Sequence, residues 1–170
     1  MGVLATQMIA QHIAFGVIAA LTIFGAIRVV TTNDVVHAAL YLVIVLASVG
    51  ASFLLLGAEF TGITQILVYV GAIVVLFLFG IMLTRAPIGE KGQLTGKNWI
   101  VGLVVSLAVF GLLGYTLIDA FGKDHLPDGS PQLTSQVGDS IFRDYLVPFE
   151  IASVLLLAAL VGAIVIARKD

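Results

Sequence analysis

The chain has 170 residues, of which 60% are hydrophobic and only 11% are charged, whereas soluble globular domains carry about 25% charged residues. Its formal net charge of −2 gives no reason to expect nucleic acid or another polyanion as a partner. The absence of cysteine excludes disulfides, thiolate metal sites, cysteine-ligated iron–sulfur clusters and cysteine nucleophiles. A single membrane domain over residues 1–170 is expected.

Five apolar runs are long enough to cross the hydrocarbon core of a bilayer as helices, which takes about 20 residues each. In chain order they are roughly Met8–Ile27, Val35–Leu56, Ile63–Leu83, Trp99–Ile118 and Val147–Ala167. The runs are too long for barrel strands and lack their alternation of polar and apolar residues. Because lipid offers the backbone no hydrogen bonds, each segment must satisfy its own. The sequence therefore predicts an all-α integral membrane protein with five transmembrane helices.

The connections between these runs differ in character. Any of the four polar residues at 31–34 can cap the second helix. The segment Gly57–Gly62 predicts a tight turn, and Thr84–Asn98 predicts a basic loop. The longer acidic connection Asp119–Leu146 contains the turn signal PDGSP at Pro127–Pro131.

The distribution of Lys and Arg predicts the orientation in the membrane. Six of these residues fall on the side that holds the C-terminus: Arg28, Arg85, Lys91, Lys97, Arg168 and Lys169. Only Lys123 and Arg143 fall on the other side. We therefore expect the N-terminus outside and the C-terminus in the cytoplasm.

Small residues spaced by four predict where the helices approach one another, since apolar burial does not drive helix association in lipid. The candidate pairs are Gly16 with Ala20, Ala47 with Ala51, and Gly102 with Ser106.

Ionisable residues inside a membrane are costly, so each is a candidate for function. Glu59 lies just before the third run, Glu150 lies in the first turn of the fifth, and His37 lies one turn into the second. Each glutamate has two interpretations: favourable interaction with a helix dipole, or a place in a proton relay or water pathway. For His37 the alternative to function is a histidine at the membrane interface.

The third run carries the most unusual pattern. Thr64, Gln65 and Tyr69 are spaced so that their polar groups lie on roughly one face, and Gly71 then removes a side chain near mid-membrane. A π-bulge at such a place often marks a functional site. The alternative is an ordinary helix contact with a hydrogen-bonded tyrosine.

No complete catalytic site is recognisable. The sequence lacks glycine-rich nucleotide motifs, and His12, His37 and His125 are too far apart to form a metal-binding pair. We expect no catalytic, cofactor-binding or metal-ligating residue on this chain, so any enzymatic activity belongs to a complex.

Several segments resemble subunit J of bacterial NADH–quinone oxidoreductase, the counterpart of subunit 6 of mitochondrial complex I. They are NDVVHAALYLV (Asn33–Val43), GAEF (Gly57–Phe60), QILVYVGAIVVLFLF (Gln65–Phe79), VGDSIFRDYLVPFE (Val137–Glu150) and PFEIASVLLLAALVGAIV (Pro148–Val165). The segments occur in the family's order, and the layout of five helices agrees.

The resemblance implies a place in the membrane arm of the complex, in the cell (inner) membrane, packed against the subunits called A, H and K. It implies that FMN, iron–sulfur clusters and quinone are bound by other subunits. It further implies that the segment at Tyr69–Gly71 is a π-bulge, whose rearrangement opens a hydrated proton path. Gln65 matches a position where some members have glutamate, and an amide does not titrate. Glu59 matches a position that varies in the family.

The leading hypothesis is therefore a subunit that couples quinone reduction to proton translocation through a switchable third helix. One alternative is a subunit of a cation/proton antiporter complex, although the sequence supplies no titratable mid-membrane site between Gly71 and Leu83. Another is a purely structural spacer between neighbouring subunits.

Overall fold

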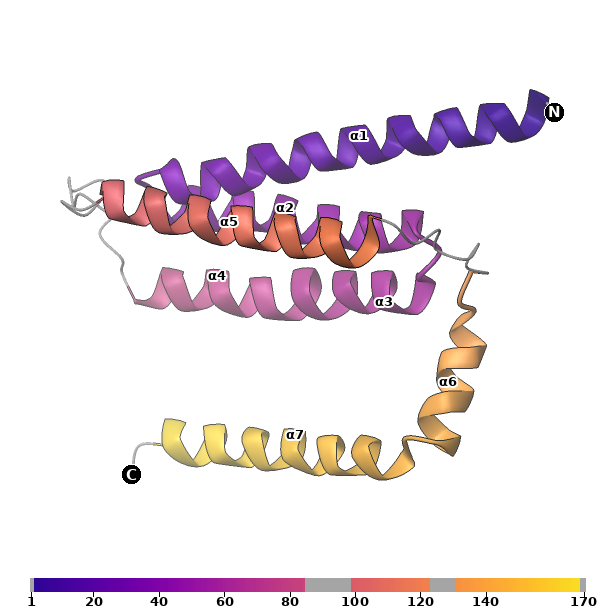
Figure 1. Ribbon diagram of the computed structural model, residues 1–170. Helices are drawn as coiled ribbons and strands as arrows, with labels where there is room; N and C mark the ends of the chain where they lie inside the picture. Colours follow the sequence, from indigo (N-terminus) through magenta and orange to yellow (C-terminus); the bar gives the residue numbers. More distant parts are fainter. Residues whose placement is uncertain (1, 85–98, 123–130, 169–170) are drawn as a thin grey trace.

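A computed structural model describes residues 2–84, 99–122 and 131–168, and within these ranges it contains helices and no strand, apart from one isolated bridge. Five helical segments are long and apolar enough to span a membrane. They run in nearly parallel or antiparallel directions, with the two termini at opposite ends (Figure 1). The prediction of an all-α protein with five membrane-spanning helices is confirmed.

The helices differ from the predicted runs mainly at their ends. Their bounds are α1 Gly2–Thr31, α2 Val35–Leu55, α3 Glu59–Thr64, η1 Gln65–Ile73, α4 Val74–Leu83, α5 Trp99–Phe121, α6 Thr134–Arg143 and α7 Leu146–Ala167. Together α3, η1 and α4 form the third span. The predicted turn Gly57–Gly62 is shorter than expected, because α3 already begins at Glu59. Most of the predicted basic loop and of the PDGSP turn lies outside the described residues.

Helix α2 is the centre of a small bundle, since it packs against α1 on one side and against the third span on the other. Glycines permit the close approaches. A Cβ at Gly25 would lie 2.9 Å from Val45 Cγ2, so α1 meets α2 there. A Cβ at Gly62 would lie 2.8 Å from Leu54 Cγ and Cδ2 and 3.1 Å from the Gly50 carbonyl oxygen. These glycines bring the backbones together, as small residues do in membrane bundles.

The predicted small-residue pairs are only partly placed at contacts. Ala47 and Ala51 are half-buried on α2. Gly16 and Gly102 have no atom within 4 Å of a Cβ built on them, so they mark no helix contact within the described part of the chain. Spacing alone was insufficient because a four-residue interval recurs on every face of an Ala- and Gly-rich helix.

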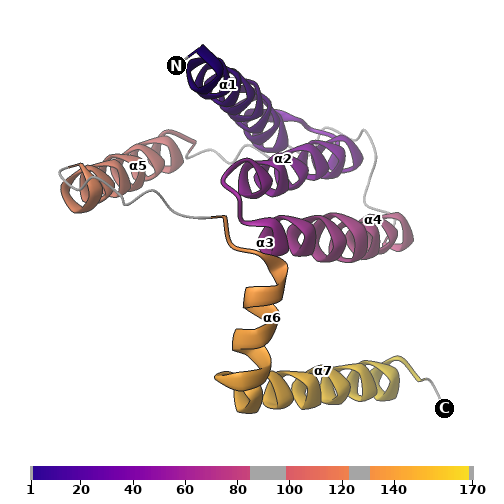
Figure 2. The same ribbon diagram turned by 90° about the vertical axis from the view of Figure 1, so that its right-hand side faces the viewer.

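Helices α5 and α7 stand apart from this bundle. Among the described helices α5 packs against none, and α7 packs only against α6. Figure 2 shows α6 running across the ends of the spans, from α3 to the start of α7, so that α7 is held away from the bundle.

Helix α6 was not predicted, because the connection Asp119–Leu146 was interpreted as a loop. It is anchored beside the turn that precedes α3: Pro131 lies against Gly57, and Ala58 pairs with Gln132. Gly57 adopts a φ of 75°, a left-handed conformation that favours glycine. The rings of Phe142 and Phe149 meet edge to face, with centroids 5.2 Å apart, and join α6 to α7.

Candidate functional site

The third span changes helical type in its middle. Residues Gln65–Ile73 form the π-helix η1, and the N–H of Val74 donates to the carbonyl oxygen of Tyr69, five residues earlier. An α-helix bonds residues four apart, and π-segments are rare and frequent at functional sites. The segment contains Tyr69 and Gly71, the two residues for which the resemblance implied a bulge.

Gln65 begins the π-helix and faces α2. Its Cγ would lie 3.5 Å from a Cβ placed on Gly50, and Ile66 Cγ1 would lie 2.8 Å from the same point. The start of the π-helix is therefore pressed against the α2 backbone, with no room for a side chain at Gly50.

Tyr69 lies further along the π-helix and is 47% exposed in the isolated chain. Within the described residues neither its hydroxyl nor the Gln65 amide has a hydrogen-bond partner. A polar group left without a partner in an apolar medium is costly. These two groups are thus available to water or to another protein chain.

Gly71 leaves room on the π-helix. A Cβ at this position would meet only the Ile66 carbonyl oxygen, at 3.5 Å, which is an ordinary contact distance. The π-helix therefore accommodates alanine at Gly71 without strain, and a longer side chain would extend into the open space beside it.

Thr64 does not extend the row of free polar groups. Its hydroxyl donates to the carbonyl oxygen of Phe60 at 2.8 Å, within its own helix. The sequence spacing placed Thr64 beside Gln65 and Tyr69, but the local hydrogen bond occupies its proton.

The two glutamates lie near the same end of the molecule, at the starts of α3 and α7. Glu59 is the first residue of α3 and is exposed, so interaction with the helix dipole explains its position there. Glu150 was predicted to lie in the first turn of the fifth span. It lies just beyond that turn, because α7 begins at Leu146 and continues through Pro148. Neither side chain has a partner within the described residues.

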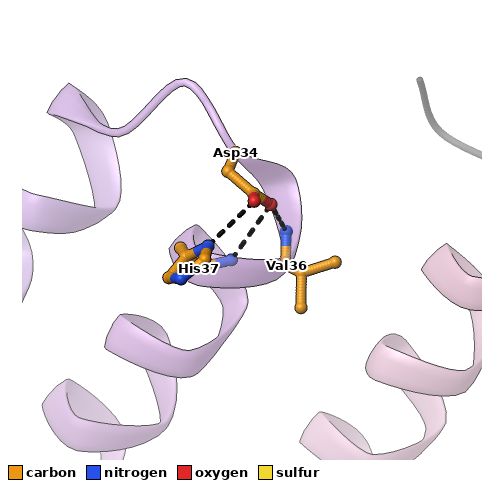
Figure 3. Close-up of polar contacts among 3 residues, drawn as sticks. All are labelled: Asp34, Val36 and His37. Carbon is orange, nitrogen blue, oxygen red and sulfur yellow. Dashed lines mark hydrogen bonds and ion pairs between the residues drawn. The ribbon is translucent and has the colours of Figure 1, made fainter. Parts of the chain in front are cut away.

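His37 lies outside this site and pairs with Asp34 (Figure 3). Asp34 Oδ2 lies 2.8 Å from His37 Nδ1, while Oδ1 accepts from the backbone N–H groups of Val36 at 2.8 Å and His37 at 3.4 Å. The hydrogen bond from His37 and the bond from the Val36 N–H hold the pKa of Asp34 below its usual value. Asp34 is thus the cap of α2.

The described residues contain no group of three or more His, Asp or Glu side chains that could hold a metal ion. The site can offer hydrogen bonds from an amide and a phenol and open space beside a glycine, so it can bind water.

Gly50 and Gly62, which fix the start of the π-helix against α2, were not identified from the sequence. Their positions could have identified them as a contact, because Gly50 and Gly62 lie at similar distances before and after the turn between the second and third spans. Antiparallel helices bring such positions to the same depth.

Comparison with known proteins gives one consistent result. The family model described as NADH-ubiquinone/plastoquinone oxidoreductase chain 6 matches residues 25–166. NAD(P)H-quinone oxidoreductase chain 6 of Leptolyngbya boryana is 40% identical over 94% of this chain and 81% of its own length. F(420)H(2) dehydrogenase subunit J of Methanosarcina mazei is 39% identical over 92% and 90%, respectively. NADH-quinone oxidoreductase subunit J of Escherichia coli K12 is 35% identical over 94% and 88%.

Proposed function

Because this chain belongs to the family of NADH-ubiquinone/plastoquinone oxidoreductase chain 6, we propose that it couples quinone reduction to proton translocation within a membrane-bound oxidoreductase. In this proposal the chain carries no redox group, and FMN, iron–sulfur clusters and quinone are bound by other subunits. Its own contribution is a conformational change of the third span.

The single observation that carries this proposal is the π-helix Gln65–Ile73 in the middle of a membrane span. Conversion to an α-helix exchanges one set of backbone hydrogen bonds for another, so neither form leaves the backbone unsatisfied. Two states of similar free energy are what a switch requires.

Both α3 and α4 pack against α2, but α4 packs more loosely, so we assign the movement to α4 and the fixed position to α3. α3 is held by the close approach of Gly62 to Leu54 and, through the preceding turn, by Pro131 against Gly57. On α4, Gly80 has open space around it, and Val74 is the only buried residue. When the backbone hydrogen bonds of η1 shift by one residue toward the α-helical pattern, α4 rotates by about 100° and moves along its axis by about 1.5 Å.

Such a rotation would reposition the Tyr69 hydroxyl and the open space beside Gly71 relative to the rest of the membrane arm. Water bound at these groups would then connect or disconnect a proton path. Glu59 and Glu150 are the titratable candidates at one end of that path, whereas Gln65 contributes hydrogen bonds to water without itself titrating.

Replacement of Gly71 by leucine tests the proposal. In the proposal the larger side chain occupies the open space beside the Ile66 carbonyl oxygen, where water would otherwise enter. We expect quinone-linked activity and proton pumping to fall severalfold, while NADH oxidation by a hydrophilic artificial acceptor remains nearly intact.

Two control variants separate this effect from general damage. Gly71→Ala fits the π-helix and should pump nearly normally. Gly80→Leu adds the same side chain to open space on the same span and should also pump. Normal pumping by a fully assembled Gly71→Leu complex would refute the switch.

The arrangement of α7 supports a place between partner subunits. α6 has 10 residues and is therefore about 15 Å long. This length exceeds the distance between the axes of packed helices, about 8–10 Å, so α6 holds α7 away from the bundle. We propose that helices of the membrane subunits A, H and K occupy this space, in the cell (inner) membrane, with the N-terminus outside.

The electron donor is not selected by this chain in our proposal. The similar proteins are named for three donors, NAD(P)H, F(420)H(2) and NADH, although all three align along nearly the whole chain. The donor is thus recognised elsewhere in the complex.

A structural spacer is the second candidate, and the separation of α5 and α7 from the bundle favours it. Tyr69→Phe distinguishes the two. A spacer loses activity only when assembly fails, whereas a proton path that uses the hydroxyl loses pumping in a fully assembled complex.

A further inference from the structure

Helix α6 connects the starts of two membrane spans. Just before α6, Gln132 pairs with Ala58, the residue that precedes α3, and after α6 only two residues separate it from α7. α3 and α7 begin the spans Glu59–Leu83 and Leu146–Ala167, and both spans extend from α6 toward the same side (Figure 1). The two ends of α6 are thus tied to one surface of the bilayer.

The length of α7 places α6 at the edge of the hydrocarbon core. α7 has 22 residues and is about 33 Å long, close to the thickness of the hydrocarbon core of about 30 Å. A helix that joins the start of α7 to the start of the third span therefore lies at the depth of the lipid headgroups. Figure 2 shows α6 running across the spans at this level.

The sequence divides α6 into an apolar half and a polar half, since successive residues of a helix lie about 100° apart. The apolar half carries the large hydrophobic side chains Leu133 (the N-cap residue), Val137, Ile141 and Phe142. The polar half carries Ser135, Gln136, Asp139, Ser140 and Arg143. This division is typical of helices that lie in the plane of a membrane surface.

The contacts of α6 show which way its apolar half faces. The Phe142 ring meets the ring of Phe149, which lies inside α7, with centroids 5.2 Å apart. Val137 and Ile141 are half-buried, whereas Ser135 and Asp139 are exposed. The apolar half is therefore turned toward the spans and the hydrocarbon core, and the polar half is turned away from them.

The chain covers only the middle of the apolar half. Leu133 and Phe142, at the two ends of α6, remain 53% and 63% exposed. Tyr145, at the corner between α6 and α7, is 61% exposed. Tyrosine is enriched at the interface between membrane and water, where its ring is in an apolar layer and its hydroxyl is in a wet one.

We propose that α6 binds the surface of the lipid bilayer, with its apolar half at the boundary of the acyl chains and its polar half in water. Asp139 and Arg143 are the charged residues of α6 and balance each other, so the helix offers no net charge to an anionic headgroup or to an oppositely charged subunit. Burial of its apolar half in lipid is the attraction. Through the pairing of Gln132 with Ala58, this anchor holds the start of the third span at the membrane surface.

The accessibility of spin labels tests this proposal in the assembled complex, reconstituted in lipid nanodiscs. Spin-labelled unnatural amino acids replace Leu133 or Phe142 on the apolar half or, as matched controls, Ser135 or Asp139 on the polar half; all four side chains are exposed. Power saturation measures how often each label collides with O₂, which concentrates in hydrocarbon, and with a water-soluble nickel chelate. We expect the ratio of O₂ to nickel collisions to be severalfold higher at positions 133 and 142 than at positions 135 and 139.

Two results would overturn the proposal. Few collisions with either reagent at positions 133 and 142 would show that another protein chain covers the apolar half, and equal ratios at all four positions would show that α6 lies in water. Quinone-linked activity reports assembly of each labelled complex, and the two apolar positions lie at opposite ends of α6, so either one decides the question if the other does not assemble. The measurement does not depend on the switch in the third span.

Discussion

At the scale of single residues, Asp34 shows what the sequence predicts about the cap of α2 and what it leaves open. The sequence offered four polar residues at 31–34 as caps for α2, and the structure selects Asp34, whose carboxylate accepts from two backbone N–H groups and from His37. The residue types predicted a cap there. Which residue serves depends on the turn geometry, because the cap needs an extended backbone, as Asp34 has (φ −100°, ψ 117°).

The lowered pKa of Asp34 predicts a pH dependence. Hydrogen bonds from His37 and Val36 favour the carboxylate in the folded protein, so its folded pKa lies below the usual 3.8. A depressed pKa contributes stability above the unfolded value, and that contribution is lost as the pH falls through the folded value. We expect Asp34→Ala to lower the melting temperature of the purified protein at pH 7 and to have little effect well below pH 3.8.

Asp34→Asn is the matched control, because the amide oxygen retains the cap without the charge. It should melt between the wild type and Asp34→Ala at pH 7. Equal melting temperatures for all three proteins at pH 7 would show that the cap and its hydrogen bond to His37 contribute nothing measurable.

At the scale of elements, the close helix contacts depend on glycines that have nothing special in sequence. Gly50 and Gly62 lie where α2 meets the third span, and a Cβ on either would overlap Ile66 or Leu54. The sequence has 18 glycines, and the rotation of each helix about its axis decides which of them face a neighbour. That rotation follows from packing and is not encoded in spacing alone.

Gly62→Ala should therefore destabilise the protein by about 1–3 kcal/mol, because the added methyl group meets both Leu54 and the Gly50 carbonyl oxygen. Gly80→Ala, placed in open space on the same span, should be neutral or stabilise by up to about 1 kcal/mol through helix propensity. Thermal melting of both variants in the same detergent measures the difference. A Gly62→Ala protein at least as stable as Gly80→Ala would show that this contact is not close.

The five spans were predictable and α6 was not, for one physical reason. Apolar runs of about 20 residues are set by the thickness of the bilayer, whereas a short interfacial helix needs only a few apolar residues on one side. On α6, Val137 and Ile141 are half-buried, and their spacing of four is the signal that could have identified it.

The π-helix was predictable only through the resemblance. Its residues include a glycine and a tyrosine between apolar neighbours, a composition that an ordinary α-helix in lipid also shows. A π-helix differs from an α-helix in its backbone hydrogen bonds, which join residues five apart, and side-chain patterns do not reveal this difference.

At the scale of the whole molecule, the chain buries little of its own surface. No residue of α5 or α7 is buried, and only Ala39 and Val74 form a fully apolar buried core among the described residues. A protein with so open an arrangement is expected to complete its packing with other chains, in agreement with relatives named as subunits or chains of oxidoreductases.

This arrangement predicts contacts between α7 and another subunit. Successive residues on a helix are about 100° apart, so photo-reactive side chains at Leu155, Leu156 and Leu157, all exposed, sample its whole circumference. In the assembled complex we expect at least one position to crosslink a peptide of another membrane subunit. Crosslinks to lipid alone from all three positions would contradict the proposed place of α7.

The central claim is that α4 rotates while α3 stays fixed, and a distance measurement tests it most directly. Spin-labelled unnatural amino acids, which leave the cysteines of other subunits unmodified, can be placed at Leu40 on α2 and Leu76 on α4, both exposed. A rotation of about 100° moves a point about 5 Å from the helix axis by about 8 Å.

Pulsed electron paramagnetic resonance of the complex, resting and frozen during turnover, should give a second distance for the Leu40–Leu76 pair during turnover. A Leu40–Ile63 pair, with its second label on the fixed helix α3, should keep one distance. If the Leu40–Leu76 distance is the same in both states of an active complex, the third span does not switch.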